Sequence, residues 1–137
     1  MSLSMMAAVG AGGAIGAMAR YGVAQFFGGG VFGMSGPMAA PMATLMVNVA
    51  GSAMMGGLAA VLAAGLPVPE AWRAFIAVGF LGALTTFSSF ALDTGQLAVR
   101  QGTAMAALYV ALSVILSLAA FFVVQALIAA ILGRLAT

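Results

Sequence analysis

Charge is almost absent from long stretches of this chain. Residues 21–69 and 101–133 carry no formally charged side chain, and the whole sequence of 137 residues has only four basic and two acidic ones. A soluble domain typically has about 25% charged residues, whereas this chain has 4% and a mean hydropathy of +1.25. About 20 apolar residues suffice for a helix to cross a bilayer. The sequence therefore predicts an all-α integral membrane protein.

Glycine- and proline-rich segments divide the chain into four predicted membrane spans. Residues 28–30 are glycines, residues 33–41 read GMSGPMAAP, and residues 65–69 read GLPVP. Proline and clustered glycine interrupt helices, so these segments predict loops. Four transmembrane helices are expected at about residues 5–27, 42–64, 70–99 and 104–132, which leaves a single four-helix domain over residues 1–137.

The residue types that the sequence lacks exclude several classes of function. It contains no cysteine and no histidine, which removes disulfides, thiol chemistry, haem ligation and ordinary zinc sites. Its four arginines never cluster, so no nucleic-acid partner is expected. Without an acid pair placed for proton transfer, the chain is not expected to be an enzyme, and no organic cofactor is expected either.

The third predicted span contains a segment that makes a poor helix. Residues 79–90 read GFLGALTTFSSF, with two glycines, two threonines and two serines. These residues are mediocre helix formers, and hydroxyl side chains offer the backbone competing hydrogen bonds. Irregular backbone survives in lipid only where protein buries it or where it lines a polar cavity. We therefore predict that the third helix is broken in mid-membrane, at a transport pathway or an ion site.

Polar side chains recur at helical spacing in three of the spans. Thr44, Asn48 and Ser52 share one face of the second span, Tyr109, Ser113 and Ser117 share one face of the fourth, and Thr85, Thr86, Ser88 and Ser89 come from the break. Polar groups in a bilayer usually face the protein interior. A single serine or threonine often bonds only to its own helix, but the Asn48 amide needs several partners. We interpret Asn48 as a pathway residue, with helix–helix bonding as the alternative.

The chemistry of these rows favours a passive anion pathway. A proton-coupled pump would need carboxylates or imidazoles at this depth, and the rows contain none. Hydroxyl and amide donors can replace the water around a small anion, and Phe87 and Phe90 can present their positive ring edges to it. Arg20, near a membrane face, either concentrates anions at a pore mouth or anchors its span at the interface.

The arginines give almost no signal for the orientation of the chain. With four spans, Arg73 and Arg134 lie on the side of the two termini, whereas Arg20 and Arg100 lie on the opposite side. Cytoplasmic loops normally carry the excess of positive charge, and here the count is balanced. Either the chain has one weakly encoded orientation, or it inserts both ways and pairs with itself antiparallel.

These features resemble the Fluc (CrcB) family of fluoride ion channels along essentially the whole chain. The matching segments are GGAIGAMARY at residues 12–21, NVAGS at residues 48–52 and GFLGALTTFSSF at residues 79–90, followed by the row of Tyr109, Ser113 and Ser117. The third segment, with Asn48 at its usual distance upstream, is the specific part of the match.

The resemblance implies a passive, fluoride-selective channel that exports cytoplasmic fluoride across a prokaryotic inner membrane. It implies an antiparallel, dual-topology homodimer with two pores. The implied pore residues are Phe87, Phe90, Asn48, Tyr109, Ser113 and Ser117, with Thr44, Ser88 and Ser89 as lesser candidates and Arg20 at the vestibule. A structural Na⁺ at the dimer interface is also implied, held by the backbone carbonyls of Gly82 and Thr85.

Two other functions compete with this interpretation. A small four-span multidrug or cation exporter would need a membrane-embedded acid, normally in its first span, and residues 1–69 contain none. A non-transporting membrane scaffold would explain the hydrophobicity but not the polar rows. Asp93, the one candidate for an intramembrane acid, is interpreted as a structural partner of Arg100 on the same helical face.

Overall fold

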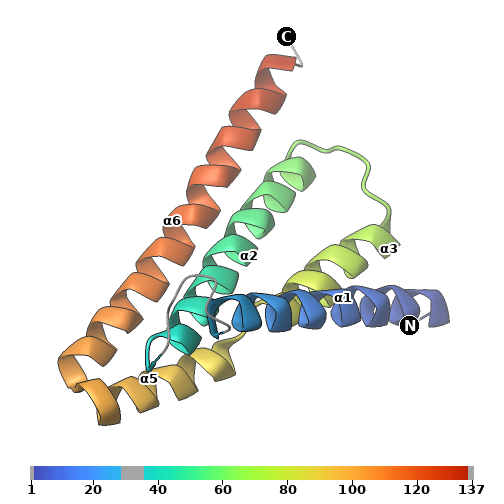
Figure 1. The fold of residues 1–137 in the computed structure, drawn as a ribbon. Helices are drawn as coiled ribbons and strands as arrows, with labels where there is room; N and C mark the ends of the chain where they lie inside the picture. The colour runs from blue at the N-terminus through green and yellow to red at the C-terminus, as the bar shows by residue number, and fades with distance from the viewer. Residues whose placement is uncertain (1, 29–35, 136–137) are drawn as a thin grey trace.

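The computed structural model describes residues 2–28 and 36–135, and the regular structure in these ranges is helical throughout (Figure 1). The helices are α1 (Leu3–Gly28), α2 (Ala39–Ala63), α3 (Glu70–Arg73), the π-helix η1 (Ala74–Leu81), α4 (Gly82–Leu84), α5 (Phe87–Gln101) and α6 (Thr103–Leu135). Of the segments predicted as loops, residues 29–30 and 33–35 lie outside the described residues, whereas residues 39–41 belong to the first turn of α2, where a proline is tolerated.

Four helical segments in the described residues are long and apolar enough to cross a membrane. They are α1, α2, the segment from α3 to α5 (Glu70–Gln101), and α6. The prediction of an all-helical chain with four span-length helices is confirmed. Proline and glycine mark their ends, since Pro69 precedes α3 and Gly102, at φ 94°, joins α5 to α6. That φ is one that residues with a side chain rarely adopt.

Glycines bring two pairs of helices into backbone contact. A Cβ on Gly12 of α1 would collide with the carbonyl oxygen of Phe75 in η1, and one on Gly56 of α2 would collide with that of Phe121 in α6. Membrane helices approach closely through such small residues. As a result α1 lies along η1, and α2 lies along α6 (Figure 1).

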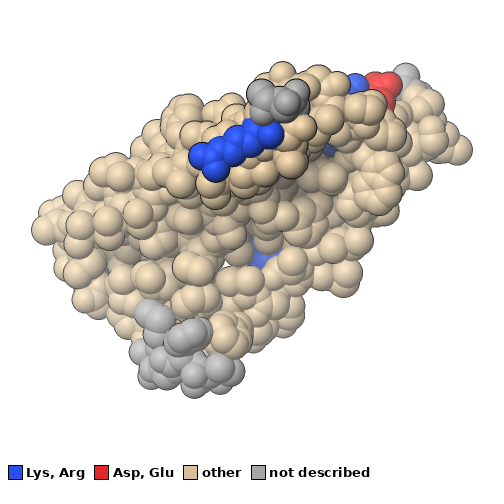
Figure 2. Space-filling view, turned by 90° about the horizontal axis from the view of Figure 1, so that it is seen from above, with Lys and Arg blue, Asp and Glu red and all other residues tan. Residues whose placement is uncertain are grey.

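Most large apolar side chains lie on the outside of the molecule. The buried clusters are small, one formed by Leu45, Leu97, Ala106 and Tyr109 and the other by Val47, Leu81 and Leu84. On the face in Figure 2, nearly all residues are uncharged. A surface of this kind suits contact with lipid or with another membrane-embedded chain.

The backbone between α4 and α5 is extended rather than helical. Thr85 has ψ 154°, and Thr86 has φ −154° and ψ 121°. Thr86 is the N-cap of α5, because its hydroxyl oxygen accepts a hydrogen bond from the Ser89 backbone N–H at 3.2 Å. The preceding π-helix η1 packs against α1.

Candidate functional site

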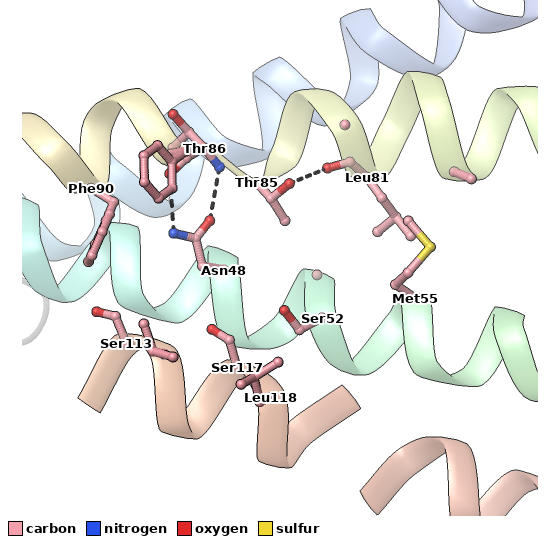
Figure 3. Close-up of a pocket in the computed structure, with 15 residues that line it drawn as sticks. Asn48, Ser52, Met55, Leu81, Thr85, Thr86, Phe90, Ser113, Ser117 and Leu118 are labelled. Carbon is pink, nitrogen blue, oxygen red and sulfur yellow. Dashed lines mark hydrogen bonds between the residues drawn. The ribbon is translucent and has the colours of Figure 1, made fainter. Parts of the chain in front are cut away.

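The carboxamide of Asn48 is bonded to the extended backbone between α4 and α5 (Figure 3). Its Nδ2 donates to the Thr86 carbonyl oxygen at 3.2 Å, and the Thr86 N–H donates to its Oδ1 at 2.9 Å. A backbone N–H only donates and a carbonyl only accepts, so these bonds fix the orientation of the amide. Asn48 thereby accepts the hydrogen bond of the Thr86 N–H, which in a continuous α-helix would go to the Gly82 carbonyl oxygen.

A cluster of hydroxyls surrounds the start of α5. The Thr86 Oγ1 lies 3.2 Å from the Ser88 Oγ and 3.2 Å from the Ser89 Oγ, to which it donates. The Thr85 hydroxyl instead bonds back to the Leu81 carbonyl at 2.8 Å, as a structural threonine does in a membrane helix. The side chain of Thr86, rather than that of Thr85, therefore belongs to the polar cluster.

A cavity of about 630 Å³, here called the ring cavity, lies between α2, α6 and the third span, of which η1, α4 and α5 all contribute to its lining (Figure 3). The rings of Phe87 and Phe90 line it, and their centroids are 5.4 Å apart. No charged residue lines this cavity in the described part of the chain. Its polar lining consists of Asn48, Ser52, Thr85, Thr86, Ser113 and Ser117.

A second cavity of about 420 Å³, here called the vestibule cavity, lies on the other side of Thr86. It contains both signs of charge, because Arg20 and Asp93 line it. Its remaining polar lining is formed by Tyr21, Thr44, Thr86 and Ser89.

Tyr109 lies buried beside the two cavities. It is 4% exposed, and its ring packs against Phe90 with centroids 5.6 Å apart. Asp93, Thr44 and Ser113 are close enough to the Tyr109 hydroxyl to interact with it electrostatically. The Tyr109 Oη, the Ser113 Oγ and one oxygen of Asp93 are buried without a hydrogen-bond partner in the protein. Buried polar atoms in folded proteins nearly always have a hydrogen-bond partner, so these three atoms stand out as groups that could bind a water or an ion.

The structure brings the predicted site residues together in two groups rather than one. The ring cavity receives Asn48, Phe87, Phe90, Ser113 and Ser117, whereas the vestibule cavity receives Arg20, Thr44 and Ser89. Tyr109 lines neither cavity, and Ser88 is exposed beside Thr86. The pore roles of these residues stay predictions.

Two features of the site differ from the sequence interpretation. Asp93 was expected to pair with Arg100, but its buried carboxylate lies near the Tyr109 hydroxyl while Arg100 is exposed at the end of α5. Thr86 was seen only as one hydroxyl of the break, yet it lines both cavities. A threonine directly before the apolar residue Phe87, at the start of a helical segment, is an N-cap signal that could have singled it out.

The fold and the site define a multi-pass helical membrane protein with two polar cavities among its spans, one of which has no charged residue in its described lining. Residues 7–125 match the model of the family described as CrcB-like protein, Camphor Resistance (CrcB). The chain belongs to this family.

Several relatives are each named Fluoride-specific ion channel FluC. The one from Rhodospirillum centenum is 47% identical over 92% of this chain and 96% of its own length. Those from Nitrobacter winogradskyi and Caulobacter vibrioides are 43% and 44% identical, over 88% and 83% of this chain and 91% and 87% of their own lengths.

Proposed function

We propose that this chain forms a passive, fluoride-selective ion channel of a prokaryotic inner membrane. The observation that carries the proposal is the ring cavity, where an amide, hydroxyls and two phenylalanine rings meet without a charged residue in the described lining. Membership of the CrcB family and the names of the relatives support the same function. Those relatives are named as channels and not as enzymes.

The lining of the ring cavity suits fluoride better than chloride. Fluoride is small and strongly hydrated, so a narrow passage has to replace its water with closely spaced donors. Asn48, Ser113 and Ser117 supply donors, and the rings of Phe87 and Phe90 can turn their positive edges to the ion. Chloride is larger and accepts weaker hydrogen bonds, so it gains less from the same groups. Passive flow is sufficient to release fluoride that HF has carried into the cell.

The test of this function is fluoride efflux from liposomes that contain the purified protein. A fluoride electrode measures release, and a chloride electrode measures the control in matched vesicles. Fast release of fluoride without chloride is expected. If folded, reconstituted protein releases no fluoride, the proposed function is wrong.

The proposal includes an antiparallel, dual-topology homodimer with a third helix broken inside the membrane. The extended backbone at Thr85 and Thr86 supports the break. The balanced arginines support insertion in both orientations. Phe87 supports a partner chain, since it lines the ring cavity and yet is 80% exposed. A second copy placed against this side would cover the exposed ring and close the cavity, giving two pores in each dimer.

The proposal also includes a structural Na⁺ held by the carbonyls of Gly82 and Thr85. In a continuous helix these oxygens would accept from the N–H groups of Thr86 and Ser89. The Thr86 N–H donates to Asn48 and the Ser89 N–H donates to the Thr86 hydroxyl, so both carbonyls are released. Free backbone oxygens at a broken helix suit a hard cation. The residues therefore fit the proposed ion, which would fix two chains at their interface.

Replacing a ring of the cavity should slow fluoride efflux. We expect Phe87→Ile and Phe90→Ile each to reduce it about tenfold, because an isoleucine has no positive edge to present to the ion. Phe122→Ile is the matched control, since Phe122 is 60% exposed on α6 and lines neither cavity. Liposome efflux and the elution volume of the dimer are the measurements. Wild-type fluoride efflux in both cavity variants would show that the rings of Phe87 and Phe90 have no role in conduction.

Removing the hydroxyls of α6 should slow efflux without loss of stability. Ser113 is buried with an unpartnered Oγ, so Ser113→Ala removes no hydrogen bond from the protein itself. We expect Ser113→Ala with Ser117→Ala to lower fluoride efflux about tenfold, because a donor to a charged ion is lost. The melting temperature should stay within the wild-type error. Ser4→Ala, at an exposed site of α1, is the control. Full fluoride efflux in the double variant would show that the hydroxyls of Ser113 and Ser117 have no role in conduction and that these residues serve only helix packing.

A further inference from the structure

The two cavities meet at Thr86. Among the described residues that line either cavity, Thr86 is the one that lines both. Its backbone is bonded to Asn48 in the ring cavity, and its hydroxyl is bonded to Ser89 in the vestibule cavity. The ring cavity also holds a buried donor without a protein partner, the Ser113 hydroxyl.

Tyr109, near residues of both cavities, is packed among buried side chains. Tyr109 is 4% exposed and lines neither cavity. It belongs to the buried cluster with Leu45 and Leu97, and its ring stacks at an angle on Phe90. Thr86, which lines both cavities, is therefore the residue of choice for an ion path between them.

We propose that Thr86 is a further pore residue at the junction of the two cavities, and that Asn48 is a positioning residue that holds it there. This inference rests on the proposed fluoride channel function. An anion arriving beside Ser89 passes to the Thr86 hydroxyl and then to Asn48. The bonds to Thr86 use one N–H and the oxygen of the amide, so its second N–H remains for the ion.

The hydroxyl of Thr86 is suited to this transfer because it exchanges one hydrogen bond for another. It has a single proton, which it donates to the Ser89 Oγ at 3.2 Å, and its oxygen accepts from the Ser89 N–H. When the proton turns to an anion, the helix cap persists because the cap uses the oxygen. Hydrogen bonds to charged acceptors are about twice as strong as neutral ones, so the exchange favours a strong acceptor such as fluoride.

Three substitutions at Thr86 test the proposal by fluoride and chloride efflux from liposomes. Thr86→Val keeps the shape and removes the hydroxyl, whereas Thr86→Ser keeps the hydroxyl. Thr86→Asp keeps an N-cap oxygen, so the start of α5 should still fold, but a carboxylate has no proton to donate and repels anions. Thr94→Val is the matched control, because the Thr94 hydroxyl only bonds back to the Phe90 carbonyl at 2.8 Å.

We expect Thr86→Val and Thr86→Asp to lower fluoride efflux about tenfold or more, since each removes a donor to a charged ion. Thr86→Ser should remain within about threefold of wild type, and Thr94→Val should equal it. If Thr86→Val fails to fold, Thr86→Asp decides, with its melting temperature as the check. Wild-type efflux in Thr86→Asp, or a Thr86→Ser as slow as Thr86→Val, would overturn the proposal. An inactive but folded wild type would instead overturn the channel function itself.

Discussion

Asn48→Leu should reduce fluoride efflux about 100-fold, because it removes a donor and releases the backbone that carries Thr86. Two hydrogen bonds are lost, and each unsatisfied polar group costs about 1–3 kcal/mol. Both bonds go to Thr86, at 3.2 and 2.9 Å, so the substitution takes these partners from the N–H and the carbonyl oxygen of Thr86 at once. The measurement is liposome efflux together with the melting temperature, which should fall as well.

Two further variants separate the role of Asn48 from a general loss of stability. Asn48→Asp keeps an oxygen that accepts from the Thr86 N–H, but it loses the donor and adds a negative charge beside the pathway. It should fold and yet release almost no fluoride. Gln96→Leu removes an amide from an exposed position of α5 and should conduct like wild type. A conducting Asn48→Leu protein would contradict both roles of Asn48.

Gly56→Ala should disrupt the pairing of α2 with α6. A Cβ at Gly56 would lie 2.9 Å from the carbonyl carbon and 3.1 Å from the Cα of Phe121, with the carbonyl oxygen closer still. These are backbone atoms, so only a displacement of α6 can relieve the overlap. Overpacking of this kind costs about 1–3 kcal/mol or more. We expect the free energy of unfolding in detergent to fall by that amount, and the yield of dimer to fall with it.

The neighbouring glycine gives a matched control for this prediction. A Cβ on Gly57 would lie 3.6 Å from the Val124 Cγ1, which is ordinary contact. Alanine is favoured over glycine in a helix by about 1 kcal/mol, so Gly57→Ala should be as stable as wild type or slightly more stable. Equal unfolding curves for Gly56→Ala and Gly57→Ala would contradict the prediction, because α6 would then move aside without a loss of stability.

The four spans could be predicted from the sequence because a bilayer imposes a simple rule on composition. Uncharged runs of sufficient length mark the helices, and proline and glycine mark their ends. The bond between Asn48 and Thr86 could not be predicted in the same way. The two residues are 38 positions apart, and helical periodicity gives the face of each residue but not its neighbour on another helix.

Periodicity also grouped residues that the fold separates. Thr44 and Asn48 are one turn apart on the same face of α2, yet Thr44 lines the vestibule cavity and Asn48 lines the ring cavity. Thr86, which is bonded to Asn48 and lines both cavities, marks the boundary at which the row divides. Asp93 is a similar case. Its spacing from Arg100 suggested an ion pair, but the fold buries its side chain near the hydroxyl of Tyr109. The π-helix η1 had no signal in its apolar sequence.

Gly102 alone separates α5 from α6, and this affects how the chain enters the membrane during synthesis. A one-residue link is too short to let the third span enter the membrane while the fourth span stays outside it. The third and fourth spans are therefore expected to insert together as a hairpin. The basic side chains nearest to this link and to residues 64–69 are Arg100 and Arg73, which lie at opposite ends of the third span and so give opposing signals for orientation. In the proposed dual-topology dimer, each newly made chain would take one orientation at insertion, and the ratio of the two orientations would be a property of biosynthesis rather than of the folded protein.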